Sequence, residues 1–218
     1  MASKLHYTSV SSELLRILKI LMVAEEFKDF RLVGGTALSL HRGHRESIDI
    51  DLFTDAQYGS IDFAAIDQFL RKTFPYVDRN EYSVGPGRSY YLGKNEPECV
   101  KLDLFYTETF IREVIIIDGI RLATEEEIIA MKIEVVSGGG RKKDFWDIHE
   151  LMDDYSIEEM VSLHEERYPY GHDQQAIIIN FSTFEKADND FDPICLRGKY
   201  WELIKLDLIE FVSSIDKT

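Results

Sequence analysis

The sequence predicts an α+β fold, in which a mixed β-sheet with flanking helices is followed by a mostly helical C-terminal region. In the first half, short apolar segments and glycine turns alternate with amphipathic helical segments. After Thr124 the pattern changes to a series of helical segments. The joint falls near residue 122, so we expect an α/β core over residues 1–122 and a helical region over residues 123–218 that closes a cleft against it.

Local signals place the elements of the first half. Apolar residues at helical spacing predict a helix over residues 11–29, with Ser12 as its N-cap. A short strand over residues 30–33 and a short helix over residues 36–42, ended by Gly43, come next. We then expect a strand, a helix and four strands, over residues 48–53, 62–73, 76–84, 89–92, 100–106 and 114–117.

The second half is predicted to be helical throughout. Thr124 is followed by three glutamates, a pattern typical of a capping box, and it predicts a helix that runs to residue 136. Three glycines at 138–140 end this helix. Further helices are expected over residues 142–154, 157–167, 173–184 and 198–213.

Composition excludes several classes of protein. The 218 residues can bury a sizeable core, and the formal charge of −15 excludes a broad basic surface for coating nucleic acid, although not a local basic site. Two cysteines provide no disulfide or zinc pattern. The most apolar run, residues 14–23, is interrupted by Arg16 and Lys19 and is too short to span a bilayer. With no signal-peptide pattern before it, we expect a soluble cytoplasmic protein.

Three aspartates in apolar segments indicate a metal site. In a strand over residues 48–53, Asp49 and Asp51 would point to one face of the sheet and Ile48 to the other, and Asp103 lies in a similar segment. Three carboxylates within about 5 Å would repel by roughly 3 kcal/mol per pair at an effective dielectric constant near 20, so a bound cation is expected. Hard oxygen ligands favour Mg²⁺ or Mn²⁺. An isolated Asp-x-Asp more often marks a solvated strand face, but this one follows a strand, a Gly-Gly turn and a helix.

The glycine turn beside these aspartates indicates phosphate binding. At Gly34-Gly35 backbone N–H groups can approach a phosphate closely, and the helix beginning at Thr36 would direct its positive end there. The Asp-x-Asp pair would then anchor a metal-bound triphosphate, and Asp103 would help to activate an acceptor hydroxyl for in-line attack on the α-phosphate. Together these parts predict a nucleotidyltransferase that uses an NTP.

The motifs resemble those of a known family. Segments 34–38 and 43–53 are similar to the signature of the AbiEii/MenT nucleotidyltransferase toxin family, within the polymerase-β-like superfamily. The similarity extends to Met131-Lys132 and to segment 141–148, and it covers about residues 30–150. It implies a nucleotidyltransferase fold and a toxin of a bacterial toxin–antitoxin or phage-defence system.

The resemblance also implies roles for individual residues. Ser47 and Asp49 would lie beside the nucleotide and the metal, and Asp144 or Asp147 would complete the site. The predicted catalytic residues are Asp49, Asp51, Asp103, Lys132 and Asp147, and the first three are the predicted metal ligands. The predicted nucleotide-binding residues are Gly34, Gly35, Thr36, Arg45, Ser47, Lys132, Lys143 and Asp144.

Basic residues near these motifs have two interpretations each. Lys132 is either an exposed helix lysine or a phosphate ligand that leaves an otherwise apolar stretch. The basic run 141–143 is either a solvated helix start or a phosphate site, and cations at a helix N-terminus oppose the macrodipole, which favours a phosphate. Arg42, His44 and Arg45 form a second basic group directly before the acidic strand, a candidate for binding triphosphate or RNA backbone.

Three functions remain open at the level of sequence. The leading one is metal-dependent transfer of a nucleoside monophosphate from an NTP to RNA, with the tRNA 3′ end as the target that the resemblance suggests and a cognate antitoxin as partner. The second has a protein side chain as acceptor, as in AMPylation. The third is a non-catalytic module that binds a nucleotide or a partner, and the presence of all three aspartates speaks against it.

Overall fold

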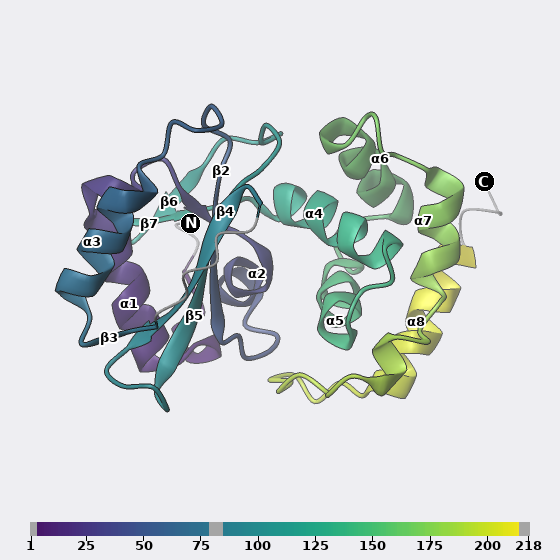
Figure 1. Ribbon diagram of the computed structural model, residues 1–218. Helices are drawn as coiled ribbons and strands as arrows, with labels where there is room; N and C mark the ends of the chain where they lie inside the picture. The colour runs from purple at the N-terminus through teal and green to yellow at the C-terminus, as the bar shows by residue number, and fades with distance from the viewer. Residues whose placement is uncertain (1–3, 79–84, 214–218) are drawn as a thin grey trace.

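The computed structural model describes residues 4–78 and 85–213, and it confirms the α+β fold class. In Figure 1 the strands lie on the left together with α1, α2 and α3, and helices α4 to α8 lie on the right. The helices are α1 (Ser12–Val23), α2 (Gly34–Arg42), α3 (Phe63–Thr73), α4 (Glu125–Ser137), α5 (Lys142–Leu151), α6 (Ile157–Arg167), α7 (Gln174–Phe181) and α8 (Trp201–Ser213). The strands are β1 (Arg31–Leu32), β2 (Asp49–Thr54), β3 (Tyr76–Val77), β4 (Gly87–Gly93), β5 (Cys99–Tyr106), β6 (Ile115–Ile117) and β7 (Ile120–Leu122).

The strands described form one mixed sheet in the order β3-β4-β5-β2-β1-β7-β6. At its centre, β2 runs parallel to β5 and antiparallel to β1, and β4 runs antiparallel to β5. Buried and half-buried residues alternate along β2, so that Ile50 and Leu52 pack into the core while the aspartates face the opposite side. Helices α1 and α3 lie on the core side of the strands, and α2 lies between the strands and α5 (Figure 1).

Several predicted boundaries in the first half need correction. Helix α1 ends at Val23, and its N-cap is Ser11, whose side chain accepts a hydrogen bond from the Leu14 N–H at 3.0 Å, rather than Ser12. The helix ends because Ala24 has an extended backbone, and Glu25–Phe27 then form a short 3-10 helix. Ile48, which was expected to face the core, precedes β2 and is 70% exposed.

The sheet edges also differ from the prediction. Of the strand expected over residues 76–84, the structure has only β3, and residues 79–84 lie outside the described part of the chain. Strand β7 was not expected; it pairs with β6 through a turn at Gly119, whose φ is +80°, and it runs parallel to β1. It therefore extends the sheet beyond β1, at the edge away from β2 and β5, the strands that carry the three aspartates.

The helical half is built around α4. Thr124 caps this helix, since its side chain accepts a hydrogen bond from the Glu127 N–H at 3.3 Å. The expected capping box is incomplete, because the Glu127 side chain accepts from the N–H groups of Ile111 and Arg112 instead. Helices α5, α6 and α7 all pack against α4, and α8 packs against α5 and α7. Helices α5, α7 and α8 are each shorter than predicted, and α6 matches its expected range. Within the described ranges no helix is long and apolar enough to cross a membrane.

Candidate active site

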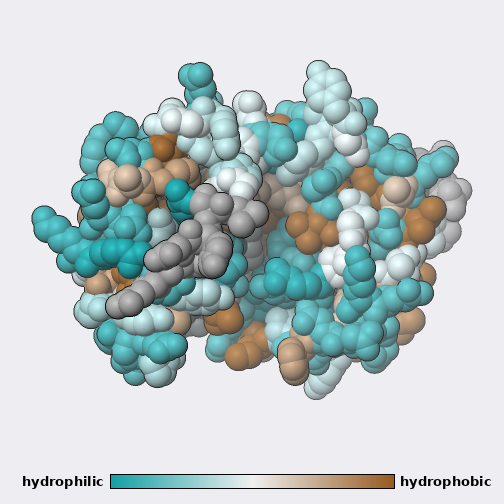
Figure 2. Space-filling model, in the orientation of Figure 1, coloured by the Kyte–Doolittle hydropathy of each residue, from teal (hydrophilic) through white to brown (hydrophobic). Residues whose placement is uncertain are grey.

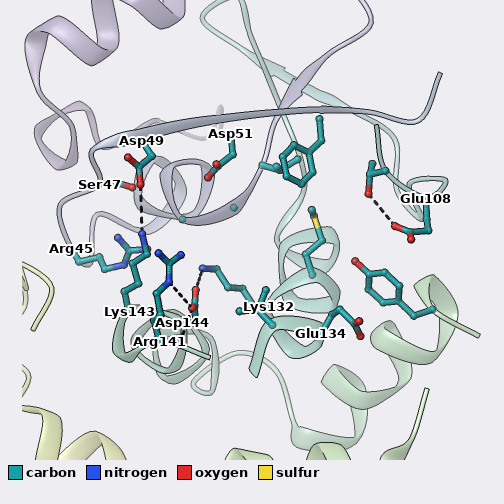
Figure 3. A pocket seen from close by; sticks show the side chains of 18 residues that line it. Arg45, Ser47, Asp49, Asp51, Glu108, Lys132, Glu134, Arg141, Lys143 and Asp144 are labelled. Atoms are coloured by element: carbon teal, nitrogen blue, oxygen red, sulfur yellow. Dashed lines mark hydrogen bonds and ion pairs between the residues drawn. The ribbon is translucent and has the colours of Figure 1, made fainter. Parts of the chain in front are cut away.

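A cavity of about 430 Å³ lies between the sheet and the helical half (Figure 3). The start of α2 and strand β2 form one wall, and α4 with the start of α5 forms the other. Nine of the residues predicted for the site line it: Gly34, Gly35, Arg45, Ser47, Asp49, Asp51, Lys132, Lys143 and Asp144. The cavity lining does not include Thr36, Asp103 or Asp147.

The three aspartates predicted as metal ligands lie on two adjacent strands. Asp51 and Asp103 are in register across the parallel β2–β5 pair, so their Cα atoms are about 5 Å apart. Burial and the negative charges of Asp103 and Asp49 raise the pKa of Asp51 to about 6. Two lysines partly compensate this charge: Lys143 Nζ lies 3.6 Å from Asp49 Oδ2, and Lys101 Nζ donates to Asp103 Oδ2 at 2.6 Å.

The donor set suits a divalent cation bound together with phosphates. Among residues 4–78 and 85–213, no three His, Cys, Asp or Glu side chains are arranged so that they could hold a metal ion by themselves. However, the Oδ1 atom of Asp103 is buried without a hydrogen-bond partner, and Asp51 is held in a charge-repelling environment. Mg²⁺ characteristically takes one or two carboxylates and completes its shell with substrate phosphates and water. Asp49 and Asp51 can provide those carboxylates at the cavity wall.

The glycine pair forms the first turn of α2 and lets charged groups approach it. Gly34 has a φ of +65°, and a Cβ there would lie 2.9 Å from Asp51 Oδ2. A Cβ on Gly35 would lie 2.3 Å from Arg45 Nη2. The prediction placed the helix start at Thr36, but the helix begins at Gly34, so the pair itself carries the free N–H groups. Both glycines are therefore needed for the close packing at this helix end.

Thr36 does not line the cavity, but its side chain contacts two residues that do. Its side chain is 1% exposed, and its hydroxyl lies 2.7 Å from the Ser47 hydroxyl and also donates to the Asp49 carbonyl. The Thr36 hydroxyl thus joins α2 to the start of β2, and it holds Ser47 at the cavity wall.

A buried ion cluster lies behind the cavity, centred on Asp147. The Asp147 carboxylate is fully buried; it accepts hydrogen bonds from Arg45 Nε at 2.6 Å and Nη2 at 2.8 Å, and His44 Nε2 lies 2.8 Å away. Burial alone would raise the pKa of Asp147, but Arg45 and Lys132 hold it well below its usual range. The cluster fixes Arg45 and Lys132 at the cavity wall, so Asp147 acts on the cavity through them.

Lys132 is a member of this cluster and not an exposed helix lysine. It is 6% exposed, and its Nζ lies 2.7 Å from Asp144 Oδ1 and 2.7 Å from Asp147 Oδ2. Burial lowers its pKa and the two aspartates raise it, with a net increase. Asp144 also accepts a hydrogen bond from the Arg141 N–H at 3.0 Å, which caps α5. The ammonium is therefore held charged at the cavity wall (Figure 3).

Arg42 does not belong to the cavity, although the sequence grouped it with His44 and Arg45. Its guanidinium pairs with Glu125 and Asp154 on the helical half. It therefore anchors α2 to that half. Of this basic group, Arg45 lines the cavity and His44 lies behind it, 1% exposed.

The far end of the cavity is formed by residues that the sequence did not indicate. Glu108 and Glu134 face this end, as Figure 3 shows. They belong to no motif, and only the fold brings the loop after β5 next to α4 and α6. The other residues there are Phe53, Thr107, Met131, Val135 and Tyr168.

Comparison with known proteins finds related sequences and a similar fold. The family model described as "Nucleotidyl transferase AbiEii toxin, Type IV TA system" matches residues 16–216. An uncharacterised protein of Aquifex aeolicus is 28% identical over 195 residues, which cover 81% of this chain and 83% of that protein. The crystal structure of JHP933 from Helicobacter pylori is similar with a TM-score of 0.59 and 21% identity, over 96% of this chain and 94% of that one. The nucleotidyltransferase toxin MenT4 of Mycobacterium tuberculosis is similar with a TM-score of 0.55 and 14% identity, over 92% of this chain and 82% of that one.

Proposed function

The chain belongs to the AbiEii family of nucleotidyltransferase toxins, and from this premise we propose that it transfers a nucleoside monophosphate from an NTP to RNA in a metal-dependent reaction. The observation that carries the proposal is the in-register pair Asp51 and Asp103, with Asp49 beside them at a cavity that begins at a helix N-terminus. A metal ion bound together with a phosphate would offset the repulsion among these carboxylates.

Asp49 and Asp51 would hold Mg²⁺ or Mn²⁺ together with the triphosphate. The ion, when bound, would neutralise phosphate charge and polarise the α-phosphate. The N–H groups of the first turn of α2 would donate to phosphate oxygens, because the glycines leave room for a close approach.

Three cations would complete the binding of the triphosphate. Lys132 and Arg45 present charges fixed by the buried aspartates, and they would counter the charge of the phosphates without having to reorient. Within the described residues the ion pair of Lys143 is to Asp49, at 3.6 Å, and this long pair would leave its ammonium available to a phosphate.

In the transfer step, the acceptor hydroxyl oxygen would bond to the α-phosphorus as the bond to the bridging oxygen of the β-phosphate breaks. Pyrophosphate would leave, and Asp103, one strand from Asp51, would accept the hydroxyl proton. RNA is the proposed acceptor because Arg141 and Lys143 line the cavity of an otherwise acidic protein. The tRNA 3′ end is the target that the family resemblance suggests.

A toxin of this kind requires a neutralising partner, so we also propose a cognate antitoxin. Its substrates, NTP and RNA, favour action in the cytoplasm. The acidic surface favours a second candidate function, transfer to a protein side chain, because a net charge of −15 repels RNA over most of the surface.

Titration calorimetry with a non-hydrolysable NTP tests the metal-bound triphosphate site. We expect binding that requires Mg²⁺ or Mn²⁺ and that Asp49→Asn severely weakens. Equal affinity of the unmodified protein in EDTA would contradict the proposed role of the aspartates.

A further inference from the structure

A second hollow, of about 280 Å³, adjoins the active-site cavity on the side of Ser47. The two share Arg45, Ser47, Arg141 and Lys143 in their walls. A molecule in the second hollow therefore has direct access to the place where we propose that the triphosphate binds. No step of the mechanism above uses this hollow.

The outer wall of the hollow comes from the connection between α7 and α8. In Figure 1 this yellow-green segment runs back from the helical half toward the strands. The Glu46 N–H donates to the Ile194 carbonyl at 2.8 Å, and the Leu196 N–H donates to the His44 carbonyl at 2.9 Å. Lys142 Nζ donates to Asp192 at 2.8 Å. These contacts hold the segment directly beside the residues that lead into β2.

The hollow combines exposed apolar side chains with cations. Phe191 is 92% exposed, Ile48 is 70% exposed and Ile194 is 61% exposed, although all three line it. Arg141, which also lines the hollow, has a side chain that is 65% exposed, and its Nε lies 3.7 Å from Asp144 Oδ2. An exposed aromatic ring together with cations is the combination that binds a base and its phosphate in single-stranded nucleic acids.

Acidic residues in the same hollow restrict what it can bind. Glu46, Asp190 and Asp192 also line it, and Lys142 neutralises Asp192. A duplex backbone, with phosphates on both sides, would meet these carboxylates. A single terminal nucleotide can place its phosphate on the Arg141 and Lys143 side alone.

We propose that this hollow is the acceptor subsite and binds the terminal nucleotide of a single-stranded RNA 3′ end. The base would stack on Phe191 and contact Ile48, and the phosphate would lie near Arg141 and Lys143. The terminal hydroxyl would then pass Ser47 into the active-site cavity. This assignment rests on the proposed function, and it gives the connection between α7 and α8 a role in choosing the acceptor.

Fluorescence anisotropy with a labelled single-stranded RNA that ends in CCA and a free 3′-hydroxyl tests the subsite. We expect Phe191→Ala to weaken RNA binding by about 5- to 150-fold, the range for loss of one base–aromatic stack, and Phe191→Trp to retain it. The control is Tyr170→Ala, since Tyr170 is fully exposed and lines neither hollow. Circular dichroism checks that each variant is folded, and a KM for RNA that rises without a change in the KM for NTP supports the assignment.

Two outcomes overturn the assignment and are distinct from failure of the proposed function. If the unmodified protein labels RNA and Phe191→Ala binds and labels it equally well, the subsite is wrong while the proposed function stands. If Phe191→Ala instead reduces labelling of a protein acceptor, the hollow binds a polypeptide. A protein that binds NTP but labels no RNA contradicts the proposed function itself, whatever the Phe191 variants do.

Discussion

Asp51, a proposed metal ligand, is held in an environment that disfavours its charge. Its folded-state pKa of about 6 lies above the ordinary value of 3.8, so the charged form is disfavoured in the folded protein. The raised pKa contributes to the free energy of unfolding of the metal-free protein. This contribution is fully present below about pH 4 and is lost as the pH rises through about 6, because between these values the folded state binds more protons than the unfolded state. Metal and nucleotide would remove the cost by neutralising the carboxylate.

Asp51→Asn should therefore stabilise the metal-free protein while abolishing transfer. We expect its free energy of unfolding in EDTA at about pH 7.5 to rise by about 1–3 kcal/mol, since a shift of one pKa unit corresponds to about 1.4 kcal/mol. Urea unfolding measures the change, and the exposed Asp153→Asn is the control. A less stable Asp51→Asn protein would mean that this carboxylate is already compensated in the metal-free state.

Two lysines of the cavity should respond differently to substitution. Lys132→Ala would leave buried Asp144 and Asp147 without their shared cation, so we expect a loss of about 3–5 kcal/mol of stability. Lys143→Ala removes only one longer, partly exposed pair and should cost less than about 1 kcal/mol.

The rate of transfer separates the two lysines further. We expect Lys143→Ala, in the folded protein, to lower transfer by about 10- to 150-fold through loss of a charge-assisted phosphate contact. Single-turnover kinetics with labelled NTP measures this effect. An unchanged rate would assign Lys143 to the surface.

At the level of residues, the sequence predicts the aspartates better than the cations. Asp49 and Asp51 are recognisable because a local alternation places both on one strand face. The burial of Lys132 is not recognisable, because its partners Asp144 and Asp147 lie on the next helix and the contact depends on how α4 and α5 pack. The roles of all these residues stay predictions until variants are measured.

At the level of elements, the first turn of α2 links the backbone to the carboxylates. Gly34→Ala would add a Cβ at 2.9 Å from Asp51 Oδ2 at a φ of +65°, so we expect displacement of Asp51 and loss of transfer. Gly119→Ala is the matched control, because Gly119 also has a positive φ, +80°, but a Cβ there meets no atom within 4 Å. Both variants carry backbone strain of about 1–2 kcal/mol, so thermal melts of both should fall while only Gly34→Ala loses transfer.

Elements with local signals are those that the sequence predicts well. Helix α6 matches its expected range because Ser156 and Glu159 form a capping box at its start. Helix α1 was predicted too long because Phe27 continues the apolar spacing after the backbone has left the helix. Strand β7 has only three residues, which is too short for a periodic pattern, and its pairing with β1 and β6 gives it its place.

At the level of the whole molecule, the proposed acceptor, RNA, carries the same sign of charge as this strongly acidic chain. Figure 2 shows a mostly hydrophilic face with small, separate hydrophobic patches. An isolated β-bridge between Arg45 and Cys195 joins two segments that are far apart in the sequence beside the cavity, and no local pattern predicts it. If RNA is the acceptor, as we propose, a net charge of −15 would leave few cations for its phosphates, among them Arg141 and Lys143 at the cavity.

The salt dependence of RNA binding should accordingly be shallow. With Arg141 and Lys143 each contacting one phosphate, we expect a slope of log K against log salt of about −1.4, from roughly −0.7 per phosphate of a single strand. Anisotropy titrations across a range of salt concentrations measure the slope. A slope steeper than about −4 would indicate a broad basic surface, which a net charge of −15 argues against.

The most direct test of the proposed function is to measure transfer of a nucleoside monophosphate to RNA. The protein is incubated with each α-labelled NTP, total RNA and Mg²⁺, alongside reactions with EDTA or with Asp51→Asn protein. We predict that label from at least one NTP enters RNA with the unmodified protein and Mg²⁺, and that EDTA and Asp51→Asn each prevent it. Label entering RNA equally well with Asp51→Asn, or entering no RNA at all while NTP still binds, would contradict the account.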